Sequence, residues 1–162
     1  MEYFHDQALV SRINHYRLSS GGGMVRKLLA IIIGVLVAGV VVMMIQKFGH
    51  NLYPPPADMD ISDQEFMREY IAGLPWGPLA FVLASYVLGT LAGGWTAASI
   101  AGQSPLLFAG IVGALILAGA VWNVMTIPHP TWFTATAVVG VLVATGIAAR
   151  FASGTSTGIK AV

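Results

Sequence analysis

The sequence predicts an all-α, polytopic membrane protein, with four transmembrane helices in a bundle and a short amphipathic helix in its outer loop. Of the 162 residues, 56% are hydrophobic and only 9% are charged, whereas soluble domains carry about 25% charged residues. So few charges cannot cover a surface that faces water. Four apolar stretches are also long enough to span a bilayer, which takes about 20 residues of helix. Backbone groups in hydrocarbon must pair within their own segment, so the stretches are expected to be helices.

The four predicted spans cover residues 28–45, 79–100, 105–127 and 131–149, and none of them contains Asp, Glu, Lys, Arg or His. The first stretch is longer than the core of a signal peptide, and no small-x-small cleavage site follows it. We therefore expect an uncleaved anchor. The short uncharged link at 101–104 makes the second and third spans an antiparallel hairpin.

The basic residues predict the orientation of the chain in the membrane. Six of them lie on the side of the termini and two on the opposite side: Arg12, Arg17, Arg26, Lys27, Arg150 and Lys160 against Lys47 and Arg68. Because Lys and Arg concentrate in cytoplasmic segments, this split predicts cytoplasmic N- and C-termini. The acidic loop between the first two spans is then periplasmic or extracellular.

The sequence divides into three parts. Residues 1–23 combine an amphipathic arm with a Ser/Gly linker at 19–23, which favours flexibility. Three interpretations of this arm stay open: an expression tag, an extension from an upstream start codon, or an interfacial amphipathic helix that docks on a membrane or partner. Residues 24–150 form the predicted four-helix transmembrane domain, and residues 151–162 a flexible C-terminal tail.

The outer loop is predicted to contain its own short helix. Three prolines at 54–56 favour stiff polyproline II backbone. Ser62 and Glu65 have the spacing of a capping box, which starts a helix. One face of this helix is apolar, it ends at Gly73, and it is expected to lie on the outer leaflet or to cap the bundle; the apolar face consists of Phe66, Met67, Tyr70 and Ile71.

Small residues at intervals of four predict where the helices pack, because they let backbones approach closely in a membrane. The second span is expected to be central. The predicted packing residues are Gly34 and Ala38 on the first span, Ser85, Gly89, Gly93 and Ala97 on the second, and Gly110, Ala114 and Ala118 on the third. The same stripe could instead face another subunit.

Polar and aromatic residues gather near the outer boundary. Tyr53, Trp76, Trp122 and Trp132, with Phe133, have the positions of an aromatic belt, or alternatively of a stacked wall for a flat ligand. Asn123 is an amide within a span and needs a partner; it either ties the third span to a neighbour or belongs to a small polar site. His50 and His129 could approach one another and hold a haem or chlorophyll-type metal, or simply bond loop carbonyls.

Several function classes lack the residues they need. Ion pumps and proton relays usually carry ionisable residues within their spans, and this chain has none there. It has no cysteine, no haem-attachment or zinc-helix motif, no phosphate-binding glycine loop and no nucleophile elbow. The sequence therefore predicts a protein that is not an enzyme. Its net charge of +1 indicates no nucleic-acid partner.

Three motifs in the sequence are distinctive: His50-Asn51-Leu52-Tyr53-Pro54-Pro55 after the first span, Leu88-Gly89-Thr90-Leu91-Ala92-Gly93-Gly94 in the second, and Ile127-Pro128-His129-Pro130-Thr131-Trp132 after the third. Together they resemble a family of small, uncharacterised four-helix bacterial membrane proteins. The resemblance covers about 24–150 and implies the four-span topology and a bacterial inner membrane. The family often has an acidic residue before the first motif, where this chain has Gln46-Lys47. The resemblance implies no particular activity.

Three functional hypotheses follow. The first is a non-catalytic accessory subunit of a larger respiratory or photosynthetic membrane complex, which would need a membrane protein partner or a homo-oligomer. The second is a membrane protein that binds a haem, quinone or pigment near His50, Asn123 and His129. The third is a small homo-oligomeric channel or transporter for a neutral solute, suggested by the glycine-rich hairpin.

Overall fold

A computed structural model describes residues 2–56, 60 and 62–158, and within these ranges it contains five helices and no strand. Four of the helices include segments long and apolar enough to cross a membrane, namely 23–52, 76–101, 105–126 and 131–154. The helices are α1 (Glu2–Leu52), α2 (Gln64–Gly73), α3 (Trp76–Ala101), α4 (Pro105–Thr126) and α5 (Thr131–Gly158). The predicted fold class is therefore confirmed.

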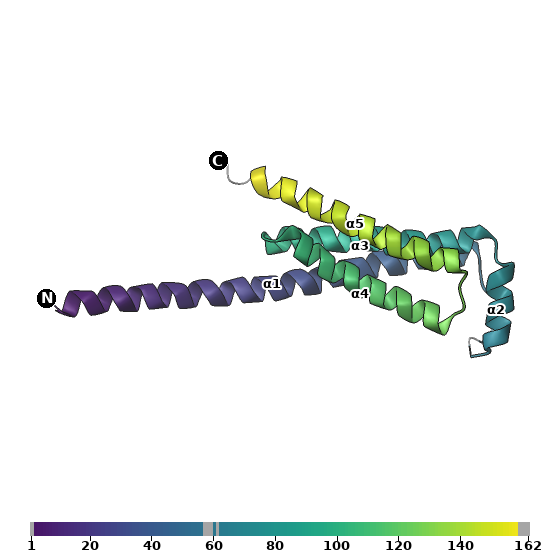
Figure 1. The fold of residues 1–162 in the computed structure, drawn as a ribbon, viewed down its shortest axis with the longest axis horizontal. Helices are drawn as coiled ribbons and strands as arrows, with labels where there is room; N and C mark the ends of the chain where they lie inside the picture. The colour runs from purple at the N-terminus through teal and green to yellow at the C-terminus, as the bar shows by residue number, and fades with distance from the viewer. Residues whose placement is uncertain (1, 57–59, 61, 159–162) are drawn as a thin grey trace.

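The four long helices run roughly along one direction, and α2 lies across one end of them (Figure 1). The start of α1 and the end of α5 lie at the opposite end from α2. Helix α3 packs against α1, α4 and α5, so the second span is central, as predicted. Helix α4 runs obliquely, and its last turns lie well away from the start of α3 (Figure 1).

Helices α1 and α3 pack through the small residues that the sequence singled out. A methyl group on Gly93 would overlap the carbonyl oxygen of Gly34 and lie 2.6 Å from the Ala38 Cβ. A methyl group on Gly89 would lie 3.1 Å from the Ala38 carbonyl oxygen. These positions accept only glycine without movement of a backbone, which explains how the two helices approach so closely. Ala97 completes the contact and is fully buried.

The small-residue stripe predicted on α4 is mostly exposed in the described part of the chain. Ala114 and Ala118 are exposed, and a methyl group on Gly110 would meet no atom within 4 Å. The residues that α4 buries are Phe108, Ala109, Val112, Gly113 and Ala120. The reason is that α4 carries small residues on two faces. The bundle uses the face of Gly113, where a methyl group would overlap the hydroxyl of Thr145 on α5.

Helices α1 and α5, the first and last of the chain, extend beyond their predicted limits. Helix α1 continues through residues 19–23, where a flexible linker was predicted, and ends only at Leu52. Helix α5 continues to Gly158, through most of the predicted tail; residues 159–162 lie outside the described part. Extending an existing helix adds one hydrogen bond for each residue fixed. A helix that begins in an apolar span can therefore continue into a neighbouring segment with low helix propensity. The proline run that begins at Pro54 cannot continue the ladder.

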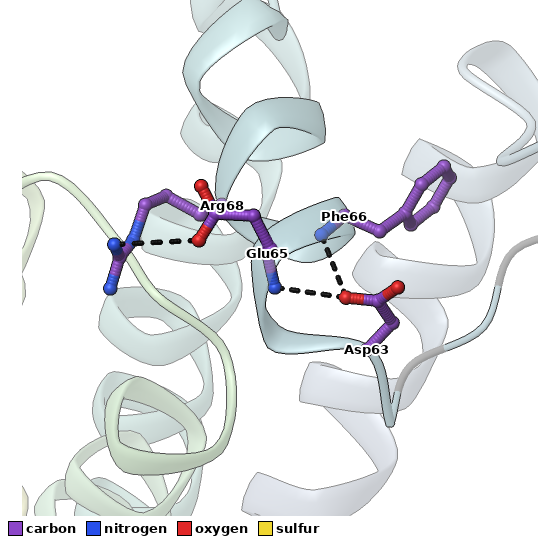
Figure 2. A network of polar contacts seen from close by, with 4 residues as sticks. All are labelled: Asp63, Glu65, Phe66 and Arg68. Carbon is purple, nitrogen blue, oxygen red and sulfur yellow. Dashed lines mark hydrogen bonds and ion pairs between the residues drawn. The ribbon is translucent and has the colours of Figure 1, made fainter.

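Helix α2 begins at Asp63 rather than at the predicted Ser62 capping box. The Asp63 carboxylate accepts hydrogen bonds from the backbone N–H groups of Glu65 and Phe66, each at 3.0 Å (Figure 2). Ser62 instead donates its hydroxyl to the Asp60 carboxylate. Asp at the N-cap satisfies two helix N–H groups directly, so the Glu65 side chain is not needed for capping.

Candidate functional site

The ends of α1, α3 and α4 that lie nearest α2 enclose a cavity of about 550 Å³; they are called the outer ends here, after the side of the membrane predicted for them. This volume lies within the range of small-molecule sites, about 300–1,000 Å³. Its lining is mostly apolar, with a few polar side chains converging from different helices, which is also typical of such sites. The polar lining residues are Gln46, His50, Tyr53, Tyr70, Tyr86, Asn123 and His129.

The cavity exists because two elements stand apart from the bundle. Helix α4 leans away from α3 toward the end nearest α2 (Figure 1), and residues of both helices line the cavity there. Helix α2 covers the cavity with Met67 and Ile71, which are 1% and 9% exposed. No Cα atom of α2 lies within 8 Å of a Cα atom of another described helix. The side chains of α2 therefore form a roof, as the capping alternative predicted, while its backbone stays clear of the bundle.

All three residues predicted as a cofactor site line this one cavity: His50, Asn123 and His129. His50 occupies the last turn of α1 and is exposed. His129 lies in the turn between α4 and α5, where its ring stacks on Phe133 with centroids 4.6 Å apart. The structure therefore brings these three side chains to one cavity. Whether they bind a cofactor stays a prediction.

The ring of His129 is held in one orientation by the backbone. Its Nδ1 atom lies 2.6 Å from the carbonyl oxygen of Ile127. A carbonyl can only accept, so Nδ1 carries the proton, and in the neutral ring Nε2 is then left with a lone pair. One nitrogen of the ring thus fixes the structure of the turn, and the other is available to a ligand.

Two hydrogen-bonded pairs form the polar floor of the cavity, a name used here for Gln46, Tyr86 and Asn123. The Asn123 amide donates to the Tyr86 hydroxyl at 3.0 Å and so ties α4 to α3, as one of the two interpretations of Asn123 predicted. The Gln46 amide donates to the Ser85 hydroxyl at 3.2 Å and ties α1 to α3. Tyr86 starts about 15 Å along α3 from its outer end, roughly half of a hydrocarbon core of about 30 Å.

Gln46 and Tyr86 were missed by the sequence reasoning. Hydroxyl groups in membrane helices can bond their own backbone, and several do here: Thr90, Thr96, Thr136 and Thr145 each donate to the carbonyl four residues earlier. A tyrosine hydroxyl is too far from its own backbone to do so, and that difference was a usable signal. Gln46 seemed to lie beyond the first span, which in fact continues to Leu52.

Aromatic and apolar side chains form the wall between the floor and the outer end. Phe81 stands at its centre, with the ring of Phe48 at 5.9 Å and that of Tyr53 at 6.3 Å between centroids. Gly49 allows this approach, because a methyl group there would lie 2.9 Å from the Phe81 Cβ. The wall is therefore a packed aromatic surface.

The predicted belt residues separate into two groups. Trp76, Trp122 and Trp132 are 79%, 73% and 50% exposed and do not line the cavity, whereas Tyr53 does. The three tryptophans thus have the exposure expected of an interfacial belt. They do not form a stacked wall for a flat ligand.

The cavity opens in two directions. At the outer end its edge is formed by the exposed residues His50, Tyr53 and Pro55. At membrane depth its edge includes Leu115, which is 50% exposed, and Gly119, beside which a methyl group would meet no atom within 4 Å. The second opening lies on the surface that the bundle presents to lipid.

Among the described residues, the lining contains no Asp, Glu, Lys or Arg. Within the described residues there is also no group of three His, Cys, Asp or Glu side chains placed to hold a metal ion. The side chains that converge here can therefore offer hydrogen bonds, aromatic surface and one or two imidazole nitrogens. That set fits recognition of an uncharged molecule.

Comparison of the chain with protein-family models, curated proteins and solved structures found no match. The resemblance to a family of four-helix bacterial membrane proteins stays a prediction. The functional argument therefore depends on the cavity and its lining.

Proposed function

We propose that this protein is a non-catalytic membrane protein that binds an uncharged, lipid-soluble small molecule in the cavity beneath α2. The observation that carries the proposal is the convergence of His50, Asn123 and His129 on one cavity of about 550 Å³. Its apolar wall would favour an apolar ligand by about 25 cal/mol for each Å² of wall surface that the ligand removes from water. Its polar floor would fix the ligand's orientation.

We further propose that the protein lies in a bacterial inner membrane with both termini in the cytoplasm. The six-to-two distribution of basic residues supports this orientation. Arg26 supports it as well, since its Nε donates to the carbonyl of Ile100 at the end of α3 that lies on the same side as the termini. The cavity would then face the outer leaflet and the periplasm.

The test is to recover the ligand with the protein. The full chain would be expressed in a bacterial host, solubilised gently and extracted with organic solvent, and the extract analysed by mass spectrometry. Gly119→Phe should reduce the recovered ligand, because the new ring would occupy the cavity edge. Gly146→Phe is the matched control, since Gly146 also has open space around it but lies on α5, which contributes no lining residue.

Two outcomes decide the proposal. A compound retained by the wild type and by Gly146→Phe, and depleted in Gly119→Phe, would support it. Identical extracts from all three proteins, containing only bulk lipid in the proportions of the host membrane, would contradict it.

A second candidate function is the accessory subunit, which one observation favours. In the part of the chain that the structure describes, Ala114 and Ala118 on α4 are exposed and a methyl group on Gly110 would meet no atom within 4 Å; stripes of small residues commonly pack against transmembrane helices. Native gels of gently solubilised membranes would test this. Migration with a larger complex that is lost in Ala114→Leu would support the accessory role, and migration of the wild type as a lone monomer would contradict it.

A further inference from the structure

We infer that the ligand is a lipid-soluble quinone that enters the cavity from the bilayer between α1 and α4. This inference depends on the proposed binding function and specifies its ligand class and its route. Four features of the described residues lead to it: the charge of the lining, the donors of the floor, the aromatic wall and the membrane-facing opening.

No Asp, Glu, Lys or Arg of the described residues lines the cavity, and this disfavours binding of the most abundant charged lipids. A phospholipid headgroup carries a phosphate, and a fatty acid carries a carboxylate. Burying either without a cationic partner is costly. Neither Lys nor Arg lines the cavity; Arg68 on α2 instead pairs with Glu65 at 3.6 Å and is largely exposed. An uncharged head group is therefore favoured.

The polar floor has more hydrogen-bond donors than the bonds between its own side chains use. The Tyr86 oxygen accepts from Asn123, and no other described residue accepts the Tyr86 hydroxyl proton, which therefore stays free to donate to a ligand. Gln46 uses its amide nitrogen once, toward Ser85, and a primary amide has two N–H groups. A buried donor without an acceptor is unfavourable. A ligand carbonyl at the floor would satisfy these groups.

The upper part of the cavity offers a second set of polar groups across an aromatic wall. His50, Tyr53 and Tyr70 line its outer end, and Phe81 lies between them and the floor. A quinone ring has carbonyl oxygens on opposite sides of a flat, apolar body, which matches two polar regions separated by aromatic surface. A simple fatty alcohol has only one polar end and would leave one region unused.

The membrane-facing opening gives the isoprenoid or alkyl tail of such a molecule a place to lie. The edge of this opening is formed by Val42 on α1 and by Leu115 and Gly119 on α4. Because Gly119 has no side chain and no neighbouring atom within 4 Å of where one would begin, the tail could pass beside it into the lipid. Entry from the bilayer then requires no movement of α2.

The experiment uses native mass spectrometry of the purified full chain, which counts bound molecules directly. Three probes would be compared: a benzoquinone with a decyl chain, decanol, and a zwitterionic phospholipid. Tyr86→Phe removes the floor hydroxyl, and Thr96→Val is its matched control, because Thr96 bonds only the Ala92 carbonyl and lies outside the cavity. Gly119→Leu narrows the opening, and Gly146→Leu is its control.

We expect one quinone to bind and Tyr86→Phe to weaken its affinity by about threefold to tenfold, the value of one hydrogen bond. Gly119→Leu should also weaken binding, and both controls should leave it unchanged. Decanol bound as tightly as the quinone, or quinone binding unaffected by Tyr86→Phe, would overturn the quinone inference while leaving the cavity as an apolar site. Preferred binding of the phospholipid would overturn it as well. If no probe binds, the proposed function fails together with the inference.

Discussion

At the scale of single residues, Gly93 shows that the packing of α1 against α3 depends on the lack of a side chain at this position. Its Cα approaches Ala38 so closely that even a methyl group would contact the neighbouring backbone. In lipid no water is released when two such helices associate, so close packing and the hydrogen bonds it allows supply the attraction. The contact between α1 and α3 therefore has little tolerance for added volume.

We predict that Gly93→Leu will destabilise the fold by about 3 kcal/mol or more, because overpacking against backbone cannot be relieved by a side-chain rotation. Thermal unfolding of the detergent-solubilised protein, followed by circular dichroism, measures this. Gly146→Leu is the control, since open space surrounds that glycine. Equal midpoints for the two variants would show that the α1–α3 contact is not close.

The hydrogen bond between Asn123 and Tyr86 gives a second prediction. Side-chain hydrogen bonds between membrane helices average about 0.6 kcal/mol in double-mutant cycles. We therefore expect Asn123→Ala and Tyr86→Phe to be non-additive by about that amount in the free energy of unfolding. Strict additivity, measured by reversible unfolding in mixed micelles, would mean that the two side chains do not interact.

Asp60 provides a prediction about pH. Hydrogen bonds from the Ser62 hydroxyl, and then from the Ser62 backbone N–H, hold the pKa of Asp60 below its usual value. The turn is therefore favoured above that usual value, about 3.9, and the contribution is lost as the pH falls through the lowered pKa. An NMR titration should place the Asp60 midpoint below that of an unstructured peptide, and Ser62→Ala should raise it; a midpoint that Ser62→Ala leaves unchanged would contradict the contact.

At the scale of elements, the structure of α2 depends on its first turn. Asp63 caps two N–H groups, and loss of an N-cap costs about 1 kcal/mol. Asp63→Ala should therefore accelerate amide hydrogen exchange across α2 and loosen the roof formed by Met67 and Ile71. Arg68→Ala, which removes only an exposed ion pair, should leave exchange nearly unchanged. Similar exchange in the two variants would contradict capping by Asp63.

The elements could be predicted from the sequence wherever hydrophobicity decides them. The limits of α3 and α4 follow from Pro75, Gly102 and Pro105, residues whose backbone preferences are strong. The limits of α1 and α5 do not, because cooperative helix extension overrides the weak local signal of a Ser/Gly run. Which face of α4 packs inward was also beyond the sequence, since both faces carry small residues and the positions of α3 and α5 select between them.

At the scale of the whole molecule, the candidate site was partly predictable for the same reason. Residues that end a span on one side of a membrane must gather at one boundary, so His50 and His129 could be placed together from topology alone. The cavity itself could not be predicted, because it results from the tilt of α4 and the separation of α2 from the bundle. Those features depend on the summed packing of all the helices.

The topology in the membrane is the last prediction, and the chain is well suited to its test because it has no cysteine. Single cysteines can be introduced at exposed positions on opposite sides of the bundle: Ser62→Cys before α2 and Gly154→Cys near the end of α5. In intact bacteria whose outer membrane has been permeabilised, a membrane-impermeant maleimide should label Ser62→Cys and not Gly154→Cys. Gly154→Cys should react only after the inner membrane is opened. The reverse pattern would place the cavity in the cytoplasmic leaflet, and the ligand would then have to be sought among molecules of that leaflet.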